Sequence, residues 1–341
     1  GITMRYREIL ETQKIWMNSS IRWWPDYLYH FTDIKNALGI LDKEWIFARN
    51  VAVSQNLMQS DNASKNVIDI TMEDAKDYAR LYFRPLTPTQ YHNEGYKPEH
   101  VRKSEVNASC PVPVFFCLNA EKVLELAGTG FVEKGLAGTS HEQIQYGTDY
   151  FANLNFQKIY HNGSHERGSD ITQYRHSEVI RRGGIPINGI VQKIVCRSLA
   201  EKQTLMYLLQ RQLPYKYKKY YHMIEYNPGR NMFYRNGIFV QRVSQTFDGL
   251  YIELNDVQLR SGRTEANGCD VHVRIVIDWF DRRNMQIIKR ESQNCELNYA
   301  LHIGINVPLQ QRATDLALVE ITFDNILMYQ DYVDLSAQLV M

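Results

Sequence analysis

The amino-acid sequence changes character at Leu213–Pro214, and this change constrains the fold more than any other feature. Upstream of it, residues 198–212 have the apolar spacing of a helix, and short strand-like segments occur among other helical ones. Downstream, almost every apolar run is strand-like, and Val271–Ile275 alternates with a period of two. The 341 residues suffice for two hydrophobic cores. We therefore expect an α+β domain over residues 1–213 and an antiparallel β-sandwich, an accessory domain of unassigned role, over residues 214–341.

The elements expected in the first domain are short. Apolar periodicity predicts helices over residues 4–17, 72–79, 149–160 and 198–212, and strands over residues 27–31, 45–48 and 112–118. Thr32 or Asp33 is expected to cap the helix that follows the first strand. Residues 50–69 are rich in Asn, Ser and Asp, which is typical of a surface loop.

The composition excludes several classes of protein. The 39 basic and 38 acidic residues balance, so any nucleic-acid contact must come from a local patch. The five cysteines lack CxxC spacing, which favours reduced thiols inside a cell. No apolar run is long enough to cross a membrane, and no signal peptide begins the sequence. We expect a cytoplasmic protein without membrane contact.

The common catalytic motifs are absent. Residues 128–136 contain glycines, but they match neither the GxGxxG pattern nor a P-loop, because Leu136 stands where lysine is required. His141-Glu142 lacks the second histidine of a zinc protease motif, and no GxSxG occurs. The sequence therefore predicts no metal site and no kinase or hydrolase chemistry.

Residues 174–190 are the segment that indicates chemistry. Two strand-like pieces are joined by a Gly-Gly turn, and Glu178 begins the first of them, behind the polar run of residues 161–170. A carboxylate among Arg175, Arg181 and Arg182 suits a site that handles phosphates and a developing positive charge. The alternative is an ordinary edge glutamate paired with an arginine.

A basic and aromatic run, YKYKKYY, occupies residues 215–221. Its tyrosines could stack nucleobases, while Lys216, Lys218 and Lys219 neutralise phosphates. The run could equally be a solvated linker between the two domains.

Three blocks, taken together, resemble a known family. They are Tyr29-His30-Phe31-Thr32 followed by a capped helix with Asn36, residues 77–91, and residues 175–180 followed by Ile185-Pro186 and Ile190. In this order and spacing they resemble the DarT toxins, DNA ADP-ribosyltransferases of bacterial toxin–antitoxin systems, over roughly residues 27–210. The sequence departs from the family at Glu44, where glycine is usual, and at Leu86, where many members have arginine.

The resemblance implies an ADP-ribosyltransferase fold, in which two small, roughly perpendicular β-sheets and surrounding helices form a cleft for NAD. It implies that His30 and Thr32, with Asn36 in the same block, hold the nicotinamide end of NAD, and that Glu178 is catalytic. The family also uses an arginine near the NAD phosphates. Arg49 is the first candidate for this role, and for a catalytic one, and Arg80 is the second.

The implied reaction transfers ADP-ribose from NAD to a nucleobase. Departure of nicotinamide leaves an oxocarbenium-like centre at C1′ of the ribose, which a fixed carboxylate can stabilise. Bases inside a duplex are hidden, so the acceptor is expected in single-stranded DNA, oriented by Arg175 and His176. Guanine is weakly favoured over thymine because of the divergent middle block and the added domain. An antitoxin that removes ADP-ribose or binds the toxin is the implied partner.

Two alternatives remain open from the sequence. The same fold could serve an ADP-ribosyltransferase acting on RNA or protein, or an NAD-dependent RNA 2′-phosphotransferase. The chain could also be a non-catalytic nucleic-acid-binding module that keeps the fold.

Overall fold

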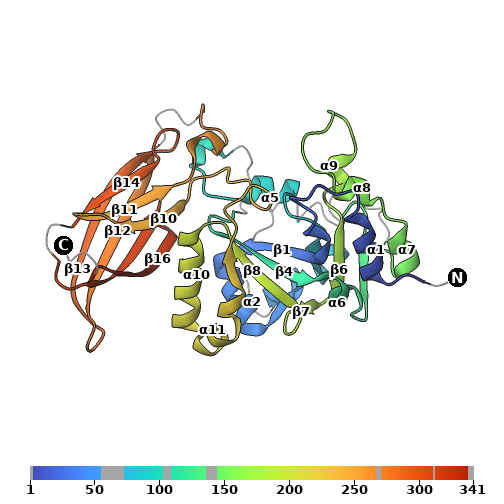
Figure 1. The fold of residues 1–341 in the computed structure, drawn as a ribbon, viewed down its shortest axis with the longest axis horizontal. Helices are drawn as coiled ribbons and strands as arrows, with labels where there is room; N and C mark the ends of the chain where they lie inside the picture. The colour runs from blue at the N-terminus through green and yellow to red at the C-terminus, as the bar shows by residue number, and fades with distance from the viewer. Residues whose placement is uncertain are drawn as a thin grey trace.

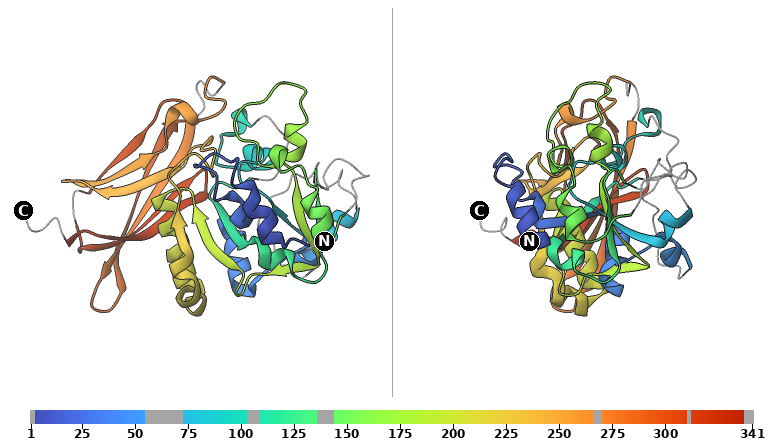
Figure 2. Two further views of the ribbon diagram at one scale, coloured as in Figure 1. Left: turned by 45° about the vertical axis from the view of Figure 1, so that its right-hand side comes forward. Right: turned by 90° about the vertical axis from the view of Figure 1, so that its right-hand side faces the viewer.

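A computed structural model describes residues 3–54, 73–102, 109–135, 144–265, 270–309 and 312–336. The chain forms two parts that lie side by side along the long axis of the molecule, with the N-terminus at one end and the C-terminus at the other (Figures 1 and 2). Helices α10 (Leu199–Gln212) and α11 (Pro214–Tyr220) lie between the two parts (Figure 1).

The first part is built on a seven-stranded sheet with the order β5-β6-β3-β1-β4-β8-β9. Neighbouring strands are antiparallel except β8 and β9, which are parallel. The strands are β1 (Tyr27–Asp33), β3 (Tyr78–Tyr82), β4 (Pro113–Asn119), β5 (Thr129–Val132), β6 (Glu178–Arg182), β8 (Val191–Cys196) and β9 (Ile224–Tyr226).

The sheet is divided where β1 meets β3. These two strands are in register only at Tyr29 opposite Tyr82, whereas β1 and β4 are in register along their whole length. The half sheet β5-β6-β3 and the half sheet β1-β4-β8-β9 therefore join at a single residue pair. This division agrees with the expectation of two sheets in an ADP-ribosyltransferase fold. A further pair of strands, β2 (Trp45–Phe47) and β7 (Gly184–Pro186), lies apart from both halves.

Short helices connect and cover the strands. They are α1 (Tyr6–Gln13), α2 (Ile34–Lys43), α3 (Arg49–Ser54), α5 (Pro88–Asn93), α6 (Ala120–Leu124), α7 (Thr148–Ala152), α8 (Phe156–Ile159) and α9 (Ile171–Tyr174). Single 3-10 turns occur at Trp24–Asp26, Glu73–Asp77, Glu99–Val101, Tyr221–Met223 and Val257–Leu259. Asp33 caps α2, since its carboxylate accepts a hydrogen bond from the main-chain N–H of Lys35. Ser198 caps α10 in the same way.

Two sequence predictions in this part were wrong. Residues 72–79 do not form a helix, because a 3-10 turn at Glu73–Asp77 leads directly into β3, whose central place in the sheet overrides the helical pattern. Residues 149–160 form two short helices, α7 and α8, although Phe151, Leu154 and Ile159 are buried as expected. Of the predicted loop over residues 50–69, residues 50–54 lie in α3 and the rest lies outside the described residues.

The second part is made of two antiparallel sheets. One has the order β10-β11-β14 and the other β13-β12-β15-β16. Their strands are β10 (Val240–Gln245), β11 (Gly249–Leu254), β12 (Asp270–Asp281), β13 (Gln286–Asn298), β14 (Gly304–Pro308), β15 (Leu316–Phe323) and β16 (Ile326–Asp334). Apolar side chains of both sheets belong to one buried cluster, which continues into the first part of the chain. The prediction of an additional C-terminal domain made of β-strands is therefore confirmed.

The first sheet does not end at the expected boundary of residues 213/214. Strand β9 pairs with β8 beyond this point, and Met232 and Phe233 pack against Phe115 and Tyr29 of the same sheet. Residues 214–233 thus complete the first part. In the described part of the chain, no helix combines the length and the apolar character that crossing a membrane requires.

Candidate active site

Glu178 is the first residue of β6 and has a side chain that is 2% exposed. Strand pairing sets it opposite Tyr82 on β3 and Val132 on β5. The preceding residue, Ser177, anchors this point, because its hydroxyl lies within hydrogen-bond distance of the main-chain oxygen atoms of Tyr174 and Glu133. The main chain at His176 packs closely against residue 135, which must be glycine. Its φ is +81°, and a Cβ there would lie 2.5 Å from the main-chain oxygen of His176.

Arg80 contacts the carboxylate of Glu178 from the neighbouring strand. Its Nε and Nη2 atoms lie 2.9 and 2.8 Å from Oε1 of Glu178. Burial acts against the charge of Arg80, but the interactions with Glu178 and Tyr82 together outweigh it and raise the pKa of Arg80. Arg80 therefore stays charged and fixes the orientation of the carboxylate.

His30 lies on β1, just past the Tyr29–Tyr82 pair, where β1 and β3 diverge. Its ring makes a hydrogen bond to the main chain of Arg80 across this gap. Burial lowers the pKa of His30 to about 4, so the imidazole is neutral near pH 7. The two half sheets thus each bring one predicted residue, His30 and Glu178, to opposite sides of Arg80.

Further polar side chains surround Glu178. Burial, and then the charge of Glu178, raise the pKa of Tyr82, which also makes a hydrogen bond to the side chain of Thr89. Burial lowers the pKa of His176, which interacts electrostatically with Glu178, Arg80 and His92. Phe83, the residue that follows β3, is fully buried, whereas Tyr82 is only partly buried and lies beside Glu178.

The other residues predicted to bind NAD occupy the β1–α2 and β2–α3 segments. Thr32 is 1% exposed near the end of β1, and Asn36 follows in the first turn of α2. Arg49 begins α3 directly after β2, and the neighbouring Ala48 donates its N–H to the main-chain oxygen of Gly183. Of the two candidate arginines, the structure therefore brings Arg80 to Glu178 and sets Arg49 near the opposite end of β6.

Arg175 lies three residues before Glu178, at the end of α9. Its Nη2 donates to the main-chain oxygen of Gly163 at 2.6 Å and to Nδ1 of His161 at 3.2 Å. These contacts tie Arg175 to the loop that joins α8 and α9, which projects from the first part in Figure 1.

The lysines of the YKYKKYY run have a different partner from the one expected. The run forms α11, and Nζ of Lys216 lies 3.0 Å from Oε2 of Glu44, while Lys219 pairs with Oε1. The hydroxyl of Tyr220 also donates to Glu44, and these contacts lower the pKa of Glu44 to about 2. Lys218 is exposed. The run is thus a docked helix, although its contact with nucleic acid stays a prediction.

The two departures from the family pattern share one backbone feature. Glu44 has φ +58° and Leu86 has φ +63°, the left-handed region that favours glycine. A glycine is therefore the unstrained choice at position 44. The ion pairs with α11 offset the strain that glutamate brings there.

Several residues beside Glu178 were not predicted from the sequence. Tyr82, His92, Ser177 and Gly135 reach it only through strand pairing and loop packing. The alternation of β3 could have indicated that Tyr82 shares a face with Arg80, since they are two residues apart.

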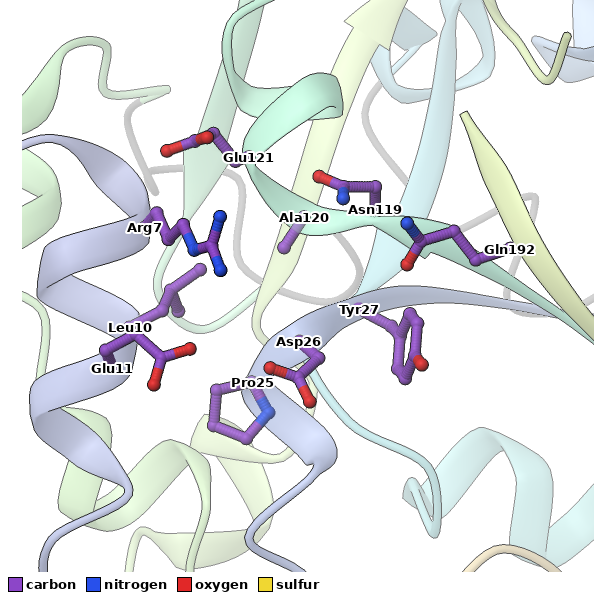
Figure 3. A pocket seen from close by; sticks show the side chains of 10 residues that line it. All are labelled: Arg7, Leu10, Glu11, Pro25, Asp26, Tyr27, Asn119, Ala120, Glu121 and Gln192. Carbon is purple, nitrogen blue, oxygen red and sulfur yellow. The ribbon is translucent and has the colours of Figure 1, made fainter. Parts of the chain in front are cut away.

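Among the described residues, no group of three or more His, Cys, Asp or Glu side chains could hold a metal ion. A cleft of about 380 Å³ lies between α1 and the ends of β1 and β4, lined by Arg7, Glu11, Asp26 and Glu121 among others (Figure 3). None of the residues predicted to act in the site lines it.

Two half sheets that meet beside a buried glutamate, with an arginine as its partner and a histidine close by, agree with the ADP-ribosyltransferase fold that the sequence predicts. Residues 29–234, more than half of the sequence, match the family described as DarT, ssDNA thymidine ADP-ribosyltransferase. The chain belongs to the DarT family. Its predicted class, an NAD-dependent DNA ADP-ribosyltransferase, is thereby confirmed. No curated protein matches the chain.

Solved structures of the family are similar to part of this chain. DarT of Thermus sp. 2.9 in complex with ADP-ribosylated ssDNA is 17% identical, with a TM-score of 0.46, over 56% of this chain and 90% of that one. The same protein in complex with NAD+ is 16% identical, with a TM-score of 0.43, over 55% and 89%. Thermosipho africanus DarTG in complex with ADP-ribose is 14% identical, with a TM-score of 0.43, over 64% and 53%.

Proposed function

We propose that this protein transfers ADP-ribose from NAD to a base of single-stranded DNA and releases nicotinamide, with Glu178 as the catalytic carboxylate. The observation that carries the proposal is the contact of Arg80 with Oε1 of Glu178 where the two half sheets join. A buried, oriented carboxylate at such a point can stabilise positive charge that develops on a ribose.

The reaction breaks the bond between C1′ and the nicotinamide nitrogen, whose electron pair stays with nicotinamide. A nitrogen of the base forms the new bond to C1′, and its proton passes to Glu178 and then to water. Neutral His30 supports this step, because it can hydrogen-bond near the nicotinamide end without repelling the positive charge of the oxidised ring. Thr32 and Asn36 also contribute to the nicotinamide end of the NAD site.

We assign the arginines different roles. Arg80 positions Glu178, and Arg49 contacts the NAD diphosphate. The support is their placement: Arg80 contacts the carboxylate, whereas Arg49 follows β2 near the other end of β6.

The acceptor base is proposed to be thymine. The description of the matched family names thymidine, which disfavours the guanine that the divergent middle block suggested. The protein further serves as a toxin that an antitoxin restrains. The resemblance to the family also implies that it acts in the cytoplasm.

Mass spectrometry of synthetic oligonucleotides after incubation with NAD tests the activity and the base together. Single strands that contain thymine should gain one ADP-ribose, while the same sequence as a duplex should not, and Glu178→Gln should abolish the gain. Modification of guanine alone would overturn the base assignment and leave the reaction standing. Transfer only to RNA or protein, or no nicotinamide release with any acceptor, would overturn the function.

A further inference from the structure

Two arginines beside the candidate active site carry charges that no described carboxylate balances. Arg84 is 1% exposed, and its guanidinium donates to the main-chain oxygen atoms of Pro85, Ile159 and His161. It also lies over the ring of Trp24, 4.5 Å from the ring centre. These contacts satisfy hydrogen bonds but supply no negative charge.

Arg175 is the second of these arginines. Its Nη2 donates to Gly163 and His161, but its Nε is buried and has no hydrogen-bond partner among the described residues. A buried donor without a partner costs free energy unless a ligand satisfies it. The Nε atom therefore points to a ligand that accepts hydrogen bonds.

Arg84, Arg175 and His161 form what we call the cation cluster. Burial, and then repulsion by the charge of Arg175, lower the pKa of Arg84 to about 9. Burial, with the charges of Arg175 and Arg84, likewise lowers the pKa of His161. An anion placed against Arg175 would relieve this repulsion and satisfy Nε at the same time.

Aromatic side chains adjoin the cation cluster. Tyr91 on α5 is 45% exposed, and its ring lies edge-on to Tyr234, 5.2 Å between ring centres. Tyr234 interacts electrostatically with both Arg175 and Arg84, and its hydroxyl donates to the main-chain oxygen of Leu86. Cations beside exposed aromatic rings are the pairing that binds single-stranded nucleic acid.

The cation cluster and Arg49 lie toward opposite ends of β6. Arg175 precedes the strand, whereas Ala48, next to Arg49, bonds Gly183 just after it. The five residues of β6 span about 16 Å. The diphosphate of NAD at Arg49 and a phosphate of the DNA strand at Arg175 would therefore occupy separate places on the two sides of Glu178.

We propose that Arg175, supported by Arg84, binds a phosphodiester of the acceptor DNA strand, and that a base next to this phosphate stacks on Tyr91. The inference rests on the proposed function and adds the residues that hold the strand. It also changes the role of Arg175 from orienting a base, as the sequence suggested, to binding the backbone.

Anisotropy of a short, fluorescein-labelled oligothymidine, measured without NAD over a range of salt concentrations, tests the proposal. Arg175→Ala should weaken binding about tenfold and reduce the slope of log K against log salt by about 0.7, because one phosphate contact is lost. Arg175→Lys keeps the charge and should keep the slope. Tyr91→Ala should weaken binding with the slope unchanged. Arg283→Ala, an exposed arginine of the accessory domain that pairs with Asp281, is the matched control and should change neither.

Calorimetry with NAD separates the two possible sources of phosphate. Unchanged NAD affinity in Arg175→Ala, together with the reduced slope, supports the strand site and shows that the variant is folded. A loss of NAD affinity with an unchanged slope would assign Arg175 to the NAD diphosphate and overturn the proposal, as would no change in either measurement. Because binding is measured without turnover, a reduced slope in a protein that transfers nothing would refute the proposed reaction and leave the strand site intact.

Discussion

Arg80 on β3 and Glu178 on β6 form an ion pair between neighbouring strands, in which Nη2 of Arg80 is 2.8 Å from Oε1 of Glu178. The glutamate side chain is 2% exposed and the arginine side chain 28%. Removing water from an ion pair is costly unless both charges are matched. The pair therefore links the stability of the catalytic strand to the chemistry that we propose for it.

Glu178→Gln should bind NAD normally and lose activity. Glutamine keeps the shape of the side chain but cannot stabilise the charge that develops only in the transition state. We expect the rate of transfer at saturating NAD to fall about 100- to 1,000-fold. Single-turnover rates and NAD calorimetry measure the two effects. A variant that keeps near-normal turnover would remove Glu178 from its catalytic role.

Arg80→Ala should destabilise the protein by about 2 kcal/mol, less than the ~3–5 kcal/mol of fully buried pairs, because Arg80 keeps some exposure. It removes the positive charge that Arg80 supplies to the buried carboxylate. Arg80→Met combined with Glu178→Gln removes both charges and should recover most of this loss. Urea unfolding of the single and double variants measures the free energy of unfolding. Equal stability of Arg80→Ala and the parent protein would show that the ion pair contributes nothing.

His30 should make the stability depend on pH below neutrality. Its pKa is about 4 in the folded protein and 6.5 in its ordinary state, so the unfolded chain binds more protons between these values. Stability is therefore fully present above pH 6.5 and declines as the pH falls toward 4. His30→Asn should remove this decline. We expect the decline in the free energy of unfolding to be at most about 2 kcal/mol, because the His30 side chain is partly exposed. Identical pH profiles of the free energy of unfolding in the two proteins would contradict the assignment.

Glu44 should show opposing effects of charge and backbone strain. Glu44→Ala loses the contacts with Lys216, Lys219 and Tyr220 and keeps the strained φ of +58°, so we expect a loss of about 1–2 kcal/mol. Glu44→Gly also loses the contacts but relieves the strain, and should lie within about 1 kcal/mol of the parent protein. Thermal unfolding of both variants gives the comparison. Glycine less stable than alanine at this position would rule out the strain argument.

Variants of the lysines on α11 serve as a control for the DNA-strand site that we propose at Arg175. If Lys216 and Lys219 serve to dock α11, replacing both with methionine should lower stability and leave the salt dependence of DNA binding unchanged. A flattened salt dependence would instead return α11 to the role of a nucleic-acid platform.

The sequence by itself determined the features that depend on neighbours along the chain. The period-two alternation of β12, the caps Asp33 and Ser198, and the Gly183–Gly184 turn after β6 could all be predicted, since each depends on a few adjacent residues. The place of Glu178 at the start of a buried strand followed from the same local reasoning. The division into an α+β part and a β-rich part was evident from the change of pattern near residue 213.

Only the tertiary structure decided which distant residues meet. Arg80 contacts Glu178 from 98 residues away through the pairing of β3 with β6, a contact that the local sequence pattern did not indicate. Lys216 and Lys219 bind Glu44 because α11 docks on the end of α2, and β9 joins the first sheet beyond the expected boundary. Such contacts depend on strand order and register, which many sequences with the same local pattern would satisfy differently.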